Sequence, residues 1–213
     1  LLFTEVSEEV GIDFHHEEND YVDFKVQPLL PHMHSKNGPG VAVADVNGDG
    51  LEDFYVGGAT NRSGAMFIQQ ANGKFKKGPV WQVDSVTEDM GVLFFDADND
   101  KDADLYIASG GSEHTKGSEL YKDQLYLNDG KGNFSELETD FTNNRATKST
   151  VVAADYDLDG DLDLFIGGRV IPGRYPMPTS SFIYQNNSQK GQVQFTDVTN
   201  KVAPELVNIG MVT

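Results

Sequence analysis

Three nine-residue segments of the sequence share one spacing of acidic side chains. They cover residues 45–53, 96–104 and 155–163, with Asp at positions 1, 5 and 9 and Asn or Asp at position 3. They hold 14 of the 34 acidic side chains and one of the 16 basic ones, so they carry most of the net charge of −18. Acidic side chains that only keep a protein soluble would be spread over its surface. Their concentration in three segments predicts three local sites instead.

The spacing suits a hard divalent cation. Carboxylates held close together repel and resist joint ionisation unless a cation neutralises them. Calcium takes about six to eight oxygen ligands, and positions 1, 3, 5 and 9 with the carbonyl at position 7 would supply most of them. Gly50 and Gly160 at position 6 fit a sharp turn with positive φ, whereas Lys101 there makes the second site geometrically doubtful. One such loop could equally be a self-capped surface turn, but three alike favour metal binding.

The flanks of these segments predict strands. An EF-hand loop needs a bidentate Glu at position 12 and flanking helices, but position 12 here is Val56, Ile107 or Ile166. Short runs rich in β-branched and aromatic residues indicate strands that enter and leave a turn. First strands are expected at 41–44, 92–95 and 151–154, and second strands at 54–56, 105–107 and 164–166, each ending at a Gly-Gly pair.

The three segments belong to a longer repeat. Their starts lie 51 and 59 residues apart, a period typical of propellers or solenoids. Each Gly-Gly pair is followed by a variable stretch, an apolar strand, a turn, and a strand that opens with Phe75, Phe134 or Phe195. The third strands are expected at 66–68, 125–127 and 182–184. Each unit thus has the content of one propeller blade, four short antiparallel strands.

The expected organisation is a single all-β domain built from β-propeller blades. Units are expected at about 41–78, 91–139 and 150–199, with 1–10 as the last strand of a preceding unit, 12–40 as a long connecting segment and 207–213 as the start of a further unit. A ring usually needs about four to eight blades, so three units predict an arc of a larger propeller. Missing blades of the same chain, or self-association, are expected to cover its open edges.

The loop motif resembles a known family. Asp-x-Asn-x-Asp-Gly-x-x-Asp after a strand, followed by an apolar strand and Gly-Gly, resembles the FG-GAP or VCBS repeats of integrin-α-type β-propellers. The runs at 3–6, 11–16 and 38–45 are similar to bacterial VCBS-repeat proteins related to the cartilage acidic protein and the ASPIC/UnbV group. This resemblance implies a seven-bladed propeller, Ca²⁺ between the first two strands of a blade, and an extracellular, cell-surface or periplasmic location.

The resemblance also implies the ligands of up to three calcium ions. Carried over to this chain, they are Asp45, Asn47, Asp49, the Leu51 carbonyl and Asp53; Asp96, Asp98, Asp100, the Asp102 carbonyl and Asp104; and Asp155, Asp157, Asp159, the Asp161 carbonyl and Asp163.

The amino-acid composition disfavours or excludes several classes of protein. The acidic balance disfavours nucleic acid, the absence of Cys excludes a disulfide scaffold, and no apolar run approaches the ~20 residues of a membrane helix, so membrane insertion is not expected. Together with the setting that the resemblance implies, the expected function is a calcium-binding propeller region of an exported or surface protein that binds a protein or glycan and is not itself an enzyme. The alternative is the non-catalytic propeller part of a secreted enzyme acting on carbohydrate.

Two further features have competing interpretations. The longer links between second and third strands, 112–121 and 170–181, suggest ligand contacts at Tyr121, Arg169, Arg174 and Tyr175, or merely cover a blade edge. Segment 12–40 contains four of the five His residues. His32 and His34 would share one face if extended, which suits a transition-metal pair, whereas the simpler interpretation is a connecting loop docked on the propeller.

Overall fold

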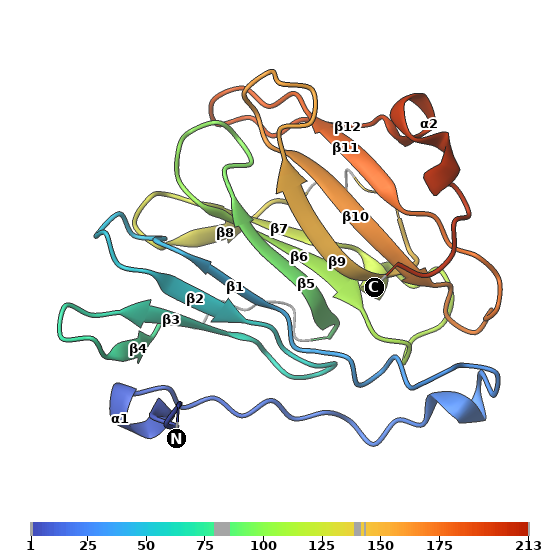
Figure 1. Cartoon of the computed structure of the whole chain (residues 1–213), viewed down its shortest axis with the longest axis horizontal. Helices are drawn as coiled ribbons and strands as arrows, with labels where there is room; N and C mark the ends of the chain where they lie inside the picture. The colour runs from blue at the N-terminus through green and yellow to red at the C-terminus, as the bar shows by residue number, and fades with distance from the viewer. Residues whose placement is uncertain (1, 79–85, 139–141, 143, 213) are drawn as a thin grey trace.

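The computed structural model describes residues 2–78, 86–138, 142 and 144–212. These residues form three four-stranded antiparallel sheets, here called blades 1, 2 and 3, with strand order following the chain in each (Figure 1). Blade 1 holds β1 (Val41–Ala44), β2 (Asp53–Val56), β3 (Ala65–Gln69) and β4 (Phe75–Lys77). Blade 2 holds β5 (Glu88–Phe95), β6 (Asp104–Gly110), β7 (Gln124–Asn128) and β8 (Phe134–Glu136). Blade 3 holds β9 (Thr147–Ala154), β10 (Asp163–Val170), β11 (Phe182–Asn186) and β12 (Phe195–Asp197).

Short helical turns lie in the connections. They are α1 (Ser7–Val10), η1 (Asp23–Lys25), η2 (Glu119–Tyr121), α2 (Thr199–Val202) and η3 (Pro204–Leu206). In the part of the chain that the structure describes, no helix has the length and apolar character needed to cross a bilayer. The all-β, blade-like prediction is confirmed by the three sheets.

The strand predictions hold best at the outer edge of each blade. The fourth strands begin at Phe75, Phe134 and Phe195, as predicted. The first strands of blades 2 and 3 begin four residues earlier than predicted, at Glu88 and Thr147. The predicted blade boundaries at residues 1, 139 and 213 lie outside the described residues.

The Gly-Gly pair does not end the second strand of blade 3. Strand β10 runs through Gly167 and Gly168 to Val170, so that part of the prediction is wrong. A Cβ at Gly168 would lie 2.1 Å from the carbonyl oxygen of Ser180. Glycine is therefore present here because two segments approach closely, and this requirement does not interrupt the strand.

In all three blades, the first two strands pair in the same register around the acidic loop. The residue before position 1 pairs with the Asp at position 9 in every blade, as Ala44 with Asp53, Phe95 with Asp104 and Ala154 with Asp163. One hairpin register thus places three chemically similar loops at the same end of adjacent sheets.

Apolar side chains between neighbouring blades form the core. Tyr55, Met66, Leu105, Ile107 and Tyr126 pack between blades 1 and 2. A second cluster packs between blades 2 and 3 and consists of Phe95, Ala97, Tyr106, Ala108, Leu125, Val151, Leu164, Ile166 and Tyr184. Each fully buried large apolar side chain contributes about 1.5–3 kcal/mol relative to an exposed one, so the blades stabilise one another through their faces.

Buried polar groups fix how the blades meet. The Tyr55 hydroxyl of blade 1 donates to the Asp89 carboxylate of blade 2 over 2.8 Å. At the next interface, Lys148 Nζ of β9 lies 2.9 Å from Asp123 Oδ1, which precedes β7, and both side chains are buried. The Tyr106 hydroxyl donates to the same Asp123 carboxylate over 2.8 Å. Because unpaired buried charges are costly, these contacts specify one relative placement of the blades.

Residues 12–40, here called the strap, cross the strand ends opposite the acidic loops (Figure 1). In the strap, Asn19 donates to the Thr60 carbonyl of blade 1 over 2.9 Å. Ser112, which follows β6 of blade 2, donates to the carboxylate of Asp23 in the strap. On blade 3, the backbone N–H of Tyr175 donates to Gln27 Oε1 over 3.1 Å. The strap therefore contacts all three blades, in agreement with a connecting segment docked on the propeller.

Candidate metal centres

The Asp at position 1 organises each acidic loop. Asp45 Oδ1 accepts from the N–H of Gly48 over 2.8 Å, and its Oδ2 accepts from Gly50 over 2.7 Å. Asp96 and Asp155 accept corresponding bonds from the N–H groups at positions 5 and 6 of their loops. The chain therefore curls around the carboxylate at position 1, so the side chains at positions 3 and 5 are held close to it.

Two positions of each loop adopt left-handed backbone conformations. At position 6, φ is 84° for Gly50, 80° for Lys101 and 102° for Gly160. Lys101 therefore adopts the same turn as the two glycines, and the backbone geometry that made the second site doubtful is the same as in the other loops. Position 4 is also left-handed, at Gly48, Asn99 and Leu158. Gly and Asn tolerate the left-handed region, so the residue types at positions 48 and 99 are consistent with it. Leu158 gives no such indication in the sequence.

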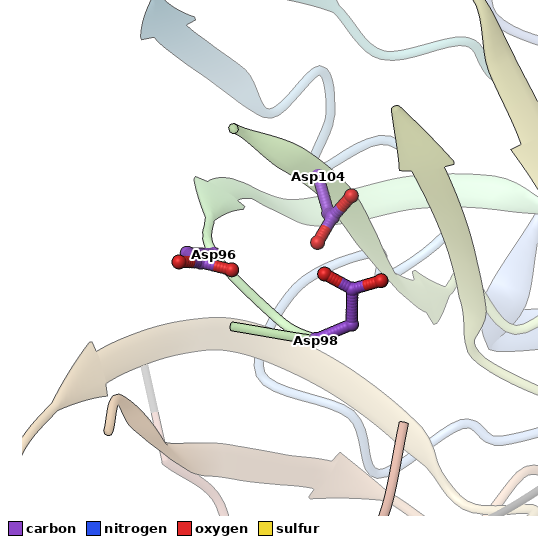
Figure 2. A group of neighbouring side chains, drawn as sticks. All are labelled: Asp96, Asp98 and Asp104. Carbon is purple, nitrogen blue, oxygen red and sulfur yellow. The ribbon is translucent and has the colours of Figure 1, made fainter. Parts of the chain in front are cut away.

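Carboxylates converge in the second and third loops. Ligand-type oxygens of Asp96, Asp98 and Asp104 all lie within 4.8 Å of one another, and Figure 2 shows these three side chains turned toward a common space. In the third loop, Asp155, Asp157 and Asp159 form an equally close group. Among the described residues, the first loop contributes no such carboxylate triplet; its position 3 is the amide of Asn47.

The second loop is the most buried of the three and holds carboxylate oxygens without partners. Asp98 and Asp104 are 5% and 1% exposed. Asp98 Oδ1 and Asp102 Oδ1 are buried, and neither accepts a hydrogen bond from the part of the chain that the structure describes. Burial raises the pKa of Asp104 to about 7, and burial followed by repulsion from Asp100 raises the pKa of Asp102 to about 7. A hard cation would offset both burial and repulsion, so the donor set fits calcium.

The Asp at position 9 also has a structural role that the sequence did not reveal. Asp104 Oδ2 accepts from the N–H of Ala97 at position 2, and its Oδ1 accepts from the N–H of Asn128 at the end of β7, both over 2.8 Å. Asp53 and Asp163 make the same two kinds of bond in their blades. Position 9 therefore ties the loop to the third strand of the blade as well as facing the predicted ion.

Two asparagines that sequence reasoning missed tie the first and second loops to the next blade. The Asn128 side-chain amide of blade 2 donates to the Val46 carbonyl of the first loop over 2.8 Å. In the same way, Asn186 of blade 3 donates to the Ala97 carbonyl of the second loop over 3.4 Å. The sequence signal is an Asn at the start of two successive turns, which by itself indicates only turn chemistry. Neighbouring loops are thus mechanically linked through position 2.

A polar cavity of about 520 Å³ separates the first two loops. Its lining includes Asp45, Asp96, Asp100 and Asp102, together with Lys101. The candidate centres are therefore open to solvent ions from the space between blades 1 and 2, and the Lys101 ammonium is the basic group at that opening.

The predicted ligand contacts do not form one site. Tyr121 is fully buried, and its hydroxyl bonds to the backbone of His114, so its use as a direct contact is contradicted. Arg169 binds the strap through the two histidines described below. Arg174 is exposed and Tyr175 is half-buried, so both remain available on the link after β10.

The histidine pair faces an arginine. His32 and His34 do lie together, with ring centroids 4.6 Å apart. Arg169 Nε donates to His34 Nδ1, and Arg169 Nη2 lies at His32 Nε2, each over 2.9 Å. Burial and the neighbouring Arg169 lower the pKa of His34 to about 4. The guanidinium contacts one nitrogen of each ring and places a positive charge beside the pair, which disfavours a transition-metal ion there.

Comparison with known families agrees with this geometry. The model of the FG-GAP-like repeat matches residues 45–107 and 109–166, more than half of the chain. The first match starts at position 1 of the first acidic loop, and the two together include all three loops. Comparison with curated proteins gives no match. With its loops and four-stranded blades in this arrangement, the chain belongs to the FG-GAP-like repeat family.

Proposed function

We propose that this chain is a calcium-binding β-propeller region of an exported or cell-surface protein and that it serves to bind a protein or a glycan. Its closer kinship with bacterial VCBS-repeat proteins related to the cartilage acidic protein and the ASPIC/UnbV group is part of the same proposal. Up to three ions would be held by the three acidic loops, with Asp98 and Asp104 among the ligands in the second.

The observation that carries the calcium proposal is the carboxylate group of the second loop. Three carboxylates from one loop meet there, and two are almost completely buried. Buried polar groups are nearly always hydrogen-bonded, yet none of the described residues donates a hydrogen bond to Asp98 Oδ1. A bound cation would satisfy that oxygen and neutralise the cluster, while a plain surface turn would leave the oxygen in water.

Support for ligand binding comes from the opposite end of the blades. A cavity of about 290 Å³ lies between the two long links, with Lys116 from the first, Ile171 from the second and Arg145 on its wall. Mixed apolar and basic linings of this kind suit a glycan or an acidic peptide. Calcium would act structurally, because ions that fix the loops also fix the blades that carry the links.

Isothermal titration calorimetry of the chelator-treated protein with CaCl₂ tests the calcium proposal. We expect saturable binding, and we expect Asp98→Asn to remove one site, because it deletes a charge from the most buried carboxylate group. The matched control is Glu136→Gln on the exposed part of β8, which should titrate as the wild type does. A wild-type titration without binding heat at millimolar calcium, together with an unchanged melting curve, would refute the proposal.

A further inference from the structure

One carboxylate outside the acidic loops is buried with both oxygens lacking a well-formed hydrogen bond from the described residues. It belongs to Glu88, the first residue of β5, which is 1% exposed. Its Oε2 lies against Gly111, where an added Cβ would be only 2.7 Å away. An ionised carboxylate in such a place is costly, so the side chain must be neutral or matched by a positive group.

The groups that face Glu88 are mostly negative. Glu18 and Asp23 face it from the strap and Glu113 faces it from the link after β6, and all three disfavour its ionisation. Glu113 Oε2 is itself buried without a hydrogen bond. The groups that favour the ionised form of Glu88 are the backbone of Asn37, which lowers its pKa, and Arg169.

Arg169 does not neutralise this cluster by itself. Its guanidinium bonds to His34 and His32 of the strap, each over 2.9 Å, and its single positive charge faces several carboxyl groups, those of Glu88 and its acidic neighbours. The Tyr121 hydroxyl also lies within electrostatic reach of Glu88, and it is neutral at physiological pH because burial raises its pKa beyond the usual range. With the strap in place, negative charge at this position therefore exceeds positive charge.

We propose that residues 12–40 form a pH-sensitive strap, which stays docked across the three blades while Glu88 is protonated and is released when Glu88 gives its proton to the solvent. Release would move Glu18 and Asp23 away from Glu88 and admit water to its carboxylate. It would also separate the strap from the long links that line the cavity at this end of the blades. The device is independent of the proposed calcium loops, which lie at the other end of the strands.

The direction of the pH effect follows from the raised pKa. Burial first, and then Glu18 and Glu113, raise the pKa of Glu88 from 4.5 to about 8 in the docked form. Once the strap is released, water around the Glu88 carboxyl restores its pKa to the ordinary value of 4.5. Between pH 4.5 and about pH 8, the docked form therefore binds more protons than the released form. Docking is therefore strongest below about pH 4.5, weakens about tenfold for each pH unit above it, and levels off above about pH 8. Burial and Arg169 keep the pKa of His34 near 4, so His34 does not titrate in the upper part of this range.

Amide hydrogen exchange tests the proposal on the full chain at constant calcium between pH 5.5 and 8.5. Protection is expressed relative to the intrinsic exchange rate at each pH. In the wild type, we expect protection of peptides from 12–40 to fall at least thirtyfold over this range, while β6 and β10 keep theirs. In Glu88→Gln, which retains the neutral shape, we expect a fall of less than threefold.

Two further variants make the result decisive. Glu136→Gln on exposed β8 should behave like the wild type. Glu113→Gln removes one negative neighbour but keeps the acceptor for Asn19, so the loss of protection should level off at a lower pH. This variant also provides the test if Glu88→Gln does not fold. A wild-type strap whose protection does not change with pH, or an equal fall in Glu88→Gln, would overturn the proposal.

Discussion

Replacing Lys148 with Met is expected to destabilise the protein by about 3–5 kcal/mol, the usual effect of removing one partner from a buried ion pair. Lys148 Nζ lies 2.9 Å from Asp123 Oδ1 with both side chains buried, and it also donates to the carbonyls of Tyr121 and Asn144. Met fills a similar volume, so little of the effect comes from a cavity. Urea denaturation of the two proteins, followed by circular dichroism, measures the difference.

The expected loss has a specific origin that a second substitution can isolate. Without Lys148, Asp123 stays buried, with donors from Tyr106 and Ser109 but no counter-charge. Adding Asp123→Asn to Lys148→Met removes the uncompensated charge and should restore at least about 1 kcal/mol. Lys190→Met on the exposed surface is the matched control, with an expected change within about 0.5 kcal/mol. A loss below about 1 kcal/mol for Lys148→Met would show that this pair does not hold blades 2 and 3 together.

Removing calcium is the second change with a large expected effect. Each site filled at a hundredfold excess over its dissociation constant adds about 2.7 kcal/mol of stability. For a chain of this size, about 2–4 °C of melting temperature accompanies each kcal/mol, so each emptied site should lower the melting temperature by about 5–10 °C. Differential scanning calorimetry with EGTA and then with excess CaCl₂ measures the loss and its recovery.

A melting temperature that does not change with calcium would contradict this expectation. Asp98→Asn should show a smaller calcium effect than the wild type, because one proposed site is weakened while the other loops are untouched. Lys101→Ala serves as the comparison within the same loop. Lys101 is exposed and shares its turn geometry with the glycines of the other loops, so its replacement should leave most of the calcium effect in place.

The repeated pattern of the sequence predicted the blades because local chemistry determines them. Alternating apolar residues, turn residues and the opening Phe of each fourth strand act within a few residues, and the fourth strands begin where predicted. The extra residues at the start of β5 and β9 were not predictable in this way. Polar side chains such as Glu88 and Thr147 lie there, and they belong to strands because the neighbouring strand pairs with them.

The sequence predicted which residues make up the candidate site, but it did not predict the hydrogen bonds that join the site to other strands and blades. Their spacing alone predicted that the Asp residues of each loop lie close together, because a turn of nine residues keeps their side chains within a small volume. The second bond of Asp104 is to Asn128, and the amide of Asn128 is bonded to a carbonyl 82 residues away in sequence. Contacts of that range depend on how blades pack, for which a local pattern carries no signal.

Two residues differ from what their type alone suggests, for the same reason. Lys101 made the second site geometrically doubtful because it is not glycine, but the hydrogen bond of its N–H to Asp96 accompanies the same left-handed turn. Tyr121 was expected at a binding surface because it lies on a long link, but that link folds inward through η2 and buries the ring. In both cases tertiary or loop hydrogen bonds outweighed the preference of the single residue.

The proposal that the acidic loops are ion sites is tested most directly by X-ray diffraction from crystals grown with calcium, measured where calcium scatters anomalously. The account predicts an anomalous peak among Asp96, Asp98 and Asp104, with further peaks in the loops around Asp45 and Asp155. Maps that show only water between the carboxylates of all three loops, at a calcium concentration that saturates ordinary extracellular sites, would contradict it.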